Sequence, residues 1–163
     1  MSTEQFNYRV QFEPFTERRY VKKFQKDYKD KWLATERTII AVCERIDNML
    51  QYNRADLIST SGCYKLVKLG FAVEGTRMSP KASGNRCILF VDEDTRAVKI
   101  LLVYSKNEIS SPNETQKWKN IIKEEHGEIA KLFEGIKAIW FSTNTSSMRV
   151  AQYRVNPNAS IFI

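Results

Sequence analysis

The sequence has little histidine and little cysteine, and this scarcity removes several kinds of active site. His126 is the single histidine in 163 residues, so an acid–base nuclease that uses two histidines is excluded. The three cysteines, Cys43, Cys63 and Cys87, lie far apart in the chain. Their spacing matches neither a disulfide framework nor a zinc site, and it favours a reducing cytoplasm. The six glycines form no phosphate-binding loop and no dinucleotide-binding fingerprint.

Long apolar runs are also missing. No stretch reaches the roughly 18 consecutive apolar residues of a membrane-spanning helix, and residues 1–10 show no apolar core of a secretory signal. We therefore expect a cytoplasmic protein without membrane contact. Aromatic residues make up 12% of the chain and hydrophobic residues 42%, whereas glycine and proline are few. This composition argues against disorder and supplies the apolar side chains of a folded core.

Positive charge is what the sequence has in excess. It holds 26 Lys and Arg against 19 Asp and Glu, a net charge of +7. Such a balance is typical of proteins that contact nucleic acid, an anionic membrane or an acidic partner. Much of the excess gathers in residues 61–86, where Glu74 is the one acid and the cations are Lys65, Lys68, Arg77, Lys81 and Arg86.

The first third of the chain predicts a strand followed by two helices. Residues 6–12 alternate apolar and polar side chains, which indicates a short strand with one buried face. Aromatic residues recur every four positions in residues 14–32, which predicts an amphipathic helix with Thr16 as a candidate cap. Residues 35–52 repeat apolar side chains at helical spacing. We expect the two helices to form a hairpin on a sheet, with residues 53–62 as a loop.

The middle of the chain predicts three strands, over residues 63–75, 85–92 and 97–105. The acidic stretch "DED" at 92–94 begins a turn between the last two strands, where Asp is favoured for turn formation rather than for metal binding. Residues 111–135 predict a helix that can bend at Gly127, with His126 facing solvent. Residues 136–163 hold further strand-like segments. The fold class is therefore α+β: an antiparallel sheet, an N-terminal helical hairpin packed on it, a C-terminal helix and a β-like extension. We expect one domain over residues 1–135, with the extension 136–163 packed on it.

The cations near the strand ends carry the chemistry that the sequence offers. Lys65, Lys68, Arg86 and Lys106 are the candidate catalytic residues, because RNA can be cleaved by attack of its own 2′-hydroxyl on the phosphate. This attack needs a base that takes the hydroxyl proton, cations that stabilise the phosphorane and an acid that protonates the leaving oxygen, and lysine and arginine side chains can supply these. No metal or cofactor is expected. Lys65 and Lys68 point to opposite faces of a regular strand, so a bulge is needed to bring both into one site. The alternative is that these lysines only keep a sheet edge soluble.

The same region resembles the RelE/ParE superfamily of bacterial toxins. The residues that carry the resemblance span roughly 6–125, and the most telling are Tyr64-Lys65, Lys68-Leu69, Gly84-Asn85-Arg86, Ile88-Leu89-Phe90 and Val98 to Lys106. The resemblance implies a RelE-like fold and the toxin component of a type II toxin–antitoxin system. It also implies cleavage of mRNA, free or on the ribosome, and neutralisation by an antitoxin protein. Lys65, Lys68, Arg86 and Lys106 take the catalytic or RNA-contacting positions, and Arg77, Lys81 and Tyr104 are further RNA-binding candidates.

Two departures from the pattern keep other functions open. The ribosome-dependent members place a catalytic tyrosine after the position of Lys106, whereas the next tyrosine here is Tyr153. Asn107 stands where some members have an arginine. The alternatives are a non-enzymatic gyrase inhibitor of the ParE kind, a basic nucleic-acid-binding module, or a basic domain that binds an acidic protein. Fold alone does not separate these functions.

Overall fold

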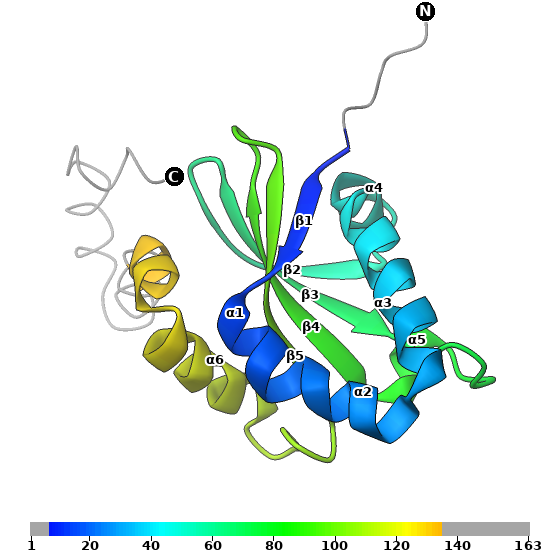
Figure 1. The fold of residues 1–163 in the computed structure, drawn as a ribbon. Coiled ribbons are helices and arrows are strands. Elements are labelled where there is room, and N and C mark those ends of the chain that lie inside the picture. The colour runs from blue at the N-terminus through cyan, green and yellow to red at the C-terminus, as the bar shows by residue number, and fades with distance from the viewer. Residues whose placement is uncertain (1–6, 135–163) are drawn as a thin grey trace, which may run out of the picture.

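The computed structural model describes residues 7–134 and contains a five-stranded mixed sheet (Figure 1). The strands lie in the order β1-β5-β4-β3-β2. Neighbouring strands from β5 to β2 are antiparallel, but β1 runs parallel to β5. The α+β class is confirmed, and the expectation of a wholly antiparallel sheet is wrong. The strands are β1 (Arg9–Phe12), β2 (Ala55–Ser61), β3 (Tyr64–Phe71), β4 (Asn85–Asp92) and β5 (Ala97–Ser105).

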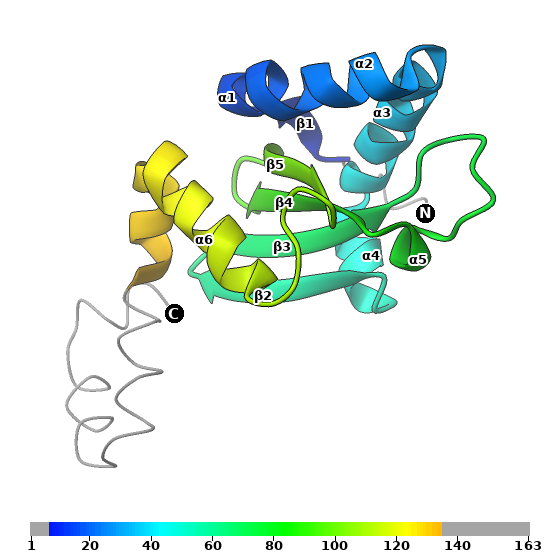
Figure 2. The same ribbon diagram turned by 90° about the horizontal axis from the view of Figure 1, so that it is seen from below.

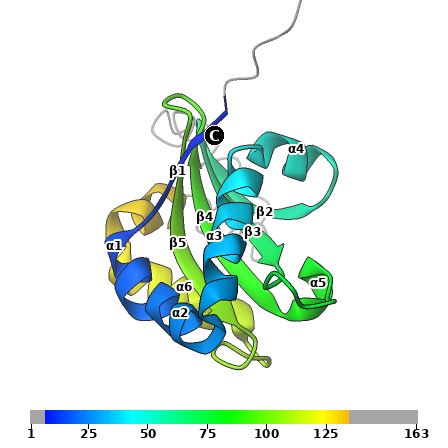
Figure 3. The same ribbon diagram turned by 45° about the vertical axis from the view of Figure 1, so that its right-hand side comes forward.

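Helices cover both faces of this sheet (Figures 1 and 3). One face carries α1 (Pro14–Thr16), a π-helical turn (Glu17–Val21), α2 (Lys22–Tyr28), α3 (Asp30–Cys43) and α4 (Ile46–Gln51). The other face carries α6 (Glu114–Glu125) and a further helical stretch over 127–134. The short α5 (Pro80–Ser83) lies beside the end of β3. None of the helices in residues 7–134 has the length and apolar character needed to cross a membrane.

The predicted helical hairpin exists, but its corner falls earlier than expected. Lys29 has a positive φ of 46°, which ends α2 and lets α3 begin at once. Trp32 therefore belongs to the second long helix, not to the first. The aromatic spacing concealed this break, because Phe24 and Trp32 stack across it with ring centroids 5.1 Å apart. Both rings pack against Phe71 of β3. The regular spacing of the aromatic residues therefore reflects a core that two helices share, and not one continuous helix.

Residues 53–62, predicted to be a loop, contain the strand β2. This strand pairs with β3 and forms one edge of the sheet (Figure 2). An edge strand needs only one ladder of hydrogen bonds, and its outward side chains meet water. Its polar sequence, ADLISTS, therefore resembles a loop. Asp56 and Leu57 are both exposed, which removes the alternation that would have indicated a strand.

The acidic stretch between β4 and β5 is a turn, as predicted. Asp92 accepts hydrogen bonds from the backbone N–H groups of Asp94 at 3.0 Å and Thr95 at 3.2 Å. This is the local arrangement that makes Asp a favoured turn residue. The predicted elements that involve Phe6, Gly135 and the extension 136–163 lie outside the described residues.

A hydrophobic core lies on each face of the sheet, and a β-bulge in β5 determines which side chains of this strand enter which core. Ile88 of β4 pairs with Leu102 and Leu89 pairs with Ile100, so Leu101 is the extra residue. Leu101 and Leu102 both enter the core under α6, while Ile100 belongs to the core under α2 and α3. The carbonyl of Leu101 is thereby left for side chains to bond.

Two residues were assigned wrongly because this bulge was not foreseen. Thr16 makes no capping bond; it is fully buried and donates to the carbonyl oxygen of Leu101 at 2.5 Å. His126 does not face solvent; it is 8% exposed and lies with Nε2 2.8 Å from the same oxygen. The helical stretches on either side of His126 meet at this residue, next to Gly127, where the sequence predicted a bend.

Candidate functional site

Lys68 and Arg86 share one face of the sheet. On β3 and β4, Lys68 pairs with Ile88 and Gly70 pairs with Arg86. Directly opposed residues in an antiparallel pair point to the same side, as do residues two apart on one strand. Lys68 and Arg86 are therefore diagonal neighbours, a spacing that long side chains can span. The pairing of β3 with β4 is therefore sufficient to bring these two predicted residues together.

A groove runs round the corner of the sheet where these residues lie. It has a volume of about 790 Å³ and is bounded by α3, α4, the start of β2, the end of β3, the segment 72–79 and α5. Figure 2 shows α4 and α5 at this end of the strands. The cations in its lining are Arg54, Lys68, Lys81 and Arg86, and the acids are Asp56 and Glu74. Lys68, Lys81 and Arg86 were predicted as catalytic or RNA-binding residues, and the groove brings the three together.

Arg86 holds α5 on the end of the sheet. Its Nη1 donates to the carbonyl oxygens of Asn85 at 2.8 Å and Pro80 at 3.2 Å, and its Nη2 donates to that of Lys81 at 3.2 Å. Three of the five guanidinium N–H bonds are thus directed at backbone, which fixes the position of the charge. Gly70 makes this approach possible, because a Cβ there would lie 3.1 Å from Pro80 O and 3.4 Å from Arg86 Nη1.

The other groove cations are available to a ligand. Arg54 and Lys81 are exposed and Lys68 is half-buried. Within residues 7–134, none of the three forms an ion pair. Asp56 stands opposite Lys68 in the strand register and offsets part of the charge there. Glu74 is engaged by the hydroxyl of Thr38, which donates to it at 2.8 Å. The groove therefore presents a net positive lining to an anion.

Lys106 lies in a neighbouring hollow rather than in the groove. This second hollow has a volume of about 240 Å³ and lies between α2 and the ends of β4 and β5. The backbone N–H of Lys106 donates to the carbonyl of Gly84 at 3.1 Å. Its side chain crosses Gly84, where a Cβ would lie 3.1 Å from Lys106 Cγ and Cδ. Gly84 and Lys106 thus close the hairpin end beside Arg86, and Lys106 lines a hollow separate from the one that Lys68 and Arg86 line.

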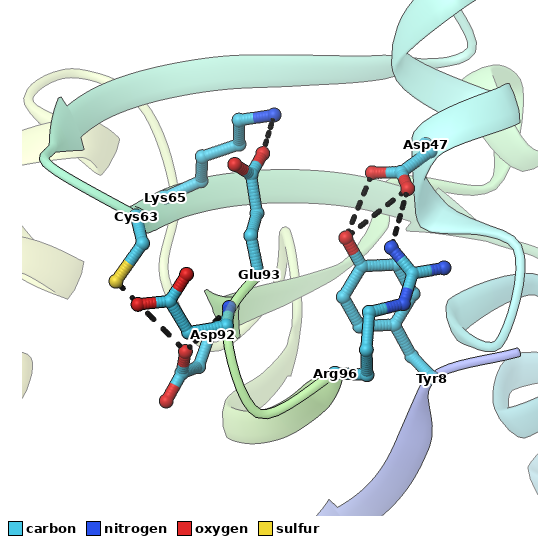
Figure 4. Close-up of polar contacts among 8 residues, drawn as sticks. Tyr8, Asp47, Cys63, Lys65, Asp92, Glu93 and Arg96 are labelled. Atoms are coloured by element: carbon cyan, nitrogen blue, oxygen red, sulfur yellow. Dashed lines mark hydrogen bonds and ion pairs between the residues drawn. The ribbon is translucent and has the colours of Figure 1, made fainter. Parts of the chain in front are cut away.

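Lys65 lies on the opposite face, near the other end of β3 (Figure 4). It forms an ion pair with Glu93 from the β4–β5 turn. β3 itself is regular, since the register shift in the β2–β3 pair falls between Leu57 and Ser59 of β2. The bulge that would have brought Lys65 beside Lys68 is therefore absent from β3.

Lys65 also lines a third hollow, in which Asp47 of α4 makes most of the polar contacts. Asp47 accepts hydrogen bonds from the hydroxyl of Tyr8, at 3.0 and 3.1 Å, and forms an ion pair with Arg96 at 3.0 Å. The Arg96 guanidinium also lies 3.8 Å from the centroid of the Tyr8 ring (Figure 4). Burial, followed by the hydrogen bond to Asp47, raises the pKa of Tyr8 well above its usual range. These contacts join the residue that precedes β1 to α4 and the β4–β5 turn, and Lys65 lies beside this structural cluster.

The remaining two RNA-binding candidates differ in their surroundings. Tyr104 is fully buried under α6, where its hydroxyl donates to Glu114 at 2.7 Å. Burial and this hydrogen bond raise the pKa of Tyr104 well above its usual range. The side chain has no surface for RNA, which corrects its assignment as a contact residue. Arg77 is exposed in the segment 72–79, beside the groove.

Sequence reasoning missed four groove residues. Arg54 precedes β2, and it was overlooked because that strand was predicted to be a loop. Val42, Met49 and Met78 form an apolar wall, and the helical spacing of the first two indicated a core position. Both are half-buried, and Met78 is 52% exposed. Within residues 7–134, no three His, Cys, Asp or Glu side chains gather closely enough to hold a metal ion.

Comparison with protein-family models, curated proteins and solved structures gives no match for this chain.

Proposed function

We propose that the groove holds the phosphates of single-stranded RNA and that the chain is the toxin component of a type II toxin–antitoxin system. Its proposed activity is metal-independent cleavage of mRNA, free or on the ribosome, and its proposed partner is an antitoxin protein. The observation that carries this is the gathering of Lys68, Lys81 and Arg86 in one groove. The resemblance of the strand, helices and meander to RelE-type toxins supports the same proposal.

The groove residues divide the chemistry between them. Arg86, held by three backbone carbonyls, is a fixed cation that can stabilise the charge of a phosphate under attack. Lys68 is the diagonal neighbour of Arg86 on the same face of the sheet. Unlike the guanidinium of Arg86, its ammonium group carries a proton that can be transferred. The ribose 2′-hydroxyl supplies the nucleophile, so the reaction needs positioning, cations and proton transfer.

Non-enzymatic binding is the second candidate function, and a specific observation favours it. The four proposed catalytic cations occupy three places: Lys68 and Arg86 in the groove, Lys106 in the next hollow, and Lys65 on the opposite face. A set of separated cations binds a polyanion more readily than it catalyses one reaction. This candidate includes a basic nucleic-acid-binding module and a gyrase inhibitor of the ParE kind.

A cleavage assay with purified protein separates the two candidates. Labelled single-stranded RNA is incubated with the protein in excess chelator, and both the bound fraction and the length of the RNA are measured. The Lys68→Ala/Lys81→Ala double variant removes two groove charges, and Lys22→Ala/Lys26→Ala removes two exposed charges from α2 as a control. We expect the first variant alone to lose binding and cleavage. Binding without shortening of the RNA would exclude cleavage of free RNA and would leave cleavage on the ribosome, which the expression experiment tests, and the second candidate. No binding by the wild-type protein would refute the RNA-binding groove.

Expression in a bacterial host tests the toxin assignment. The proposal requires growth arrest with loss of full-length mRNA, and relief of the arrest by the groove variant. Growth arrest with intact mRNA and a DNA-damage response would assign the chain to gyrase inhibition instead. Harmless expression of the wild-type protein would refute the toxin proposal.

A further inference from the structure

The groove has an apolar wall as well as a cationic side, and the two together define a ligand. We propose that it accepts one base of single-stranded RNA against this wall while the adjoining phosphates contact the cations. This rests on the RNA binding proposed above and adds a base-binding pocket to it. The wall consists of Val42, Met49 and Met78.

The wall is accessible, although it continues a buried core. Beneath it lie Ile39, Leu69, Phe71 and Val73, which are all at most 5% exposed. Met78, on the segment that follows β3, is 52% exposed, so its side chain is open to a ligand. A concave site of several hundred Å³ with apolar walls and a few charged groups is the usual form of a small-ligand pocket. A nucleobase is a flat group of suitable size, whose faces can pack on apolar side chains while its polar edge remains in contact with water.

The charged side of the groove favours a nucleotide over a peptide. Arg54, Lys68, Lys81 and Arg86 outnumber the two acids, and one of these acids, Glu74, is bonded to Thr38. Lys68 and Arg86 point to the α6 face of the sheet, while Met49 belongs to α4 on the other face, so the groove turns round the sheet corner between them. A nucleotide fits this shape if its base lies against the apolar wall and its phosphate lies beside Lys68 and Arg86.

The chemistry of the wall also determines its selectivity. Among the groove residues described here, Phe71 carries the one aromatic ring, and it is 5% exposed. Thioether and aliphatic side chains adapt to many shapes and make no directional hydrogen bonds with base edges. The wall itself is therefore expected to give no preference for one base over another.

The test compares a short single-stranded oligo-uridine with an oligomer of the same length whose residues lack bases. Binding is measured by fluorescence anisotropy, and the methionine methyl groups, labelled with carbon-13, are followed by NMR. We expect the base-containing oligomer to bind about fivefold more tightly, a gain of the size that burial of a small apolar area against the wall provides. It should also shift the methyl signals of Met49 and Met78, whereas the abasic oligomer should not.

Two variants locate the effect. Met49→Gln/Met78→Gln keeps the side-chain length but adds polarity, and it should bring the ratio of the two affinities close to one. Leu33→Gln changes an exposed apolar residue of α3 outside the groove, and it should leave the ratio unchanged. Equal binding of both oligomers by the wild-type protein would overturn the pocket while leaving RNA binding intact. Absence of binding by either oligomer would overturn both proposals. Methyl shifts caused by an acidic Glu–Leu repeat peptide but not by RNA would assign the groove to a protein partner and overturn the pocket.

Discussion

Thr16 and His126 bond the same carbonyl oxygen, that of Leu101, from opposite ends of the described chain. Thr16 Oγ1 lies 2.5 Å and His126 Nε2 lies 2.8 Å from it. Because a carbonyl oxygen can only accept, both side chains must be donors, and the proton of His126 is on Nε2. Leu101 is the bulged residue of β5, so these two side chains replace the strand partner that it lacks. The contact joins the N-terminal helical segment, the sheet and the helices after β5.

Removal of the Thr16 hydroxyl should lower the stability of the fold. Thr16→Val keeps the shape of the side chain and removes the donor, so the free energy of unfolding should fall by about 1–2 kcal/mol. Urea unfolding followed by circular dichroism measures this. Thr115→Val, at an exposed position of α6, is the control and should change the free energy by less than about 0.5 kcal/mol. Equal stability of the two variants would mean that His126 alone satisfies the Leu101 carbonyl.

Addition of one methyl group at Gly70 should disturb the groove. In Gly70→Ala the new Cβ meets Pro80 O at 3.1 Å and Arg86 Nη1 at 3.4 Å, so α5 or the guanidinium must move. We expect weaker RNA binding and faster backbone hydrogen exchange in residues 80–86. Gly127→Ala is the matched control, because a Cβ there meets nothing within 4 Å. Unchanged RNA affinity in Gly70→Ala would show that Arg86 need not be fixed for binding.

The sequence was sufficient to predict β3, β4, β5 and the turn between the last two. These strands are apolar over many residues because helices cover both of their faces. Lys68 and Arg86 could be assigned to two of these recognisable strands, and the register between β3 and β4 puts them on one face of the sheet. Strand β2 could not, because an edge strand with exposed Asp56 and Leu57 follows no alternation.

The part of the site that could not be predicted depends on contacts between distant segments. The alternation of side chains says that Lys65 and Lys68 face opposite sides, but only the structure shows that the bulges fall in β2 and β5 and leave β3 regular. The burial of Tyr104 depends on α6, which the sequence did not place on a face. The apolar wall depends on Met78 together with Val42 of α3 and Met49 of α4, which lie far from it in the sequence.

The stability of the protein should decrease at alkaline pH, and Tyr104 should account for part of this decrease. Burial and the hydrogen bond to Glu114 raise its pKa above the ordinary value of 10.0. The folded state then keeps a proton that the unfolded state releases, so this contribution is complete below pH 10.0 and is lost as the pH rises above it. Cys43 and Cys87, whose pKa is also raised by burial from 9.0, should begin the decrease at lower pH.

The variant that tests this is Tyr104→Phe. It should be less stable than the wild type at neutral pH by about 1 kcal/mol, through loss of the hydrogen bond to Glu114. Above about pH 10 its unfolding free energy should decline less steeply, by about 1.4 kcal/mol per pH unit. Urea unfolding at a series of pH values gives both quantities. Tyr52→Phe, at a residue 66% exposed, should follow the wild-type curve; a parallel curve for Tyr104→Phe would contradict the expectation.

Removal of the acid opposite Lys68 should strengthen RNA binding. Asp56 pairs with Lys68 in the register and lines the same groove, so Asp56→Asn removes a repulsion for phosphate. We expect the affinity for single-stranded RNA to rise about threefold at low salt, with a smaller gain at high salt because the effect is electrostatic. Glu124→Gln makes the same change in net charge at an exposed position of α6 and is the control. An equal gain in both variants would show that net charge, rather than the groove, determines the affinity.

Lys65 and Lys68 provide the sharpest test of where RNA binds, because they are the same residue type three positions apart on one strand. Lys68 lines the groove and forms no ion pair within residues 7–134, whereas Lys65 is paired with Glu93 on the other face. Lys68→Ala should weaken RNA binding about three- to tenfold and reduce the slope of log affinity against log salt by about 1. Lys65→Ala should leave both quantities unchanged, and Lys106→Ala should have an intermediate effect, because that lysine lies in the adjoining hollow. Anisotropy titrations over a range of salt concentrations measure all three. If Lys65→Ala weakened binding as much as Lys68→Ala, RNA would have to contact both faces of the sheet, and the groove would not be the binding site.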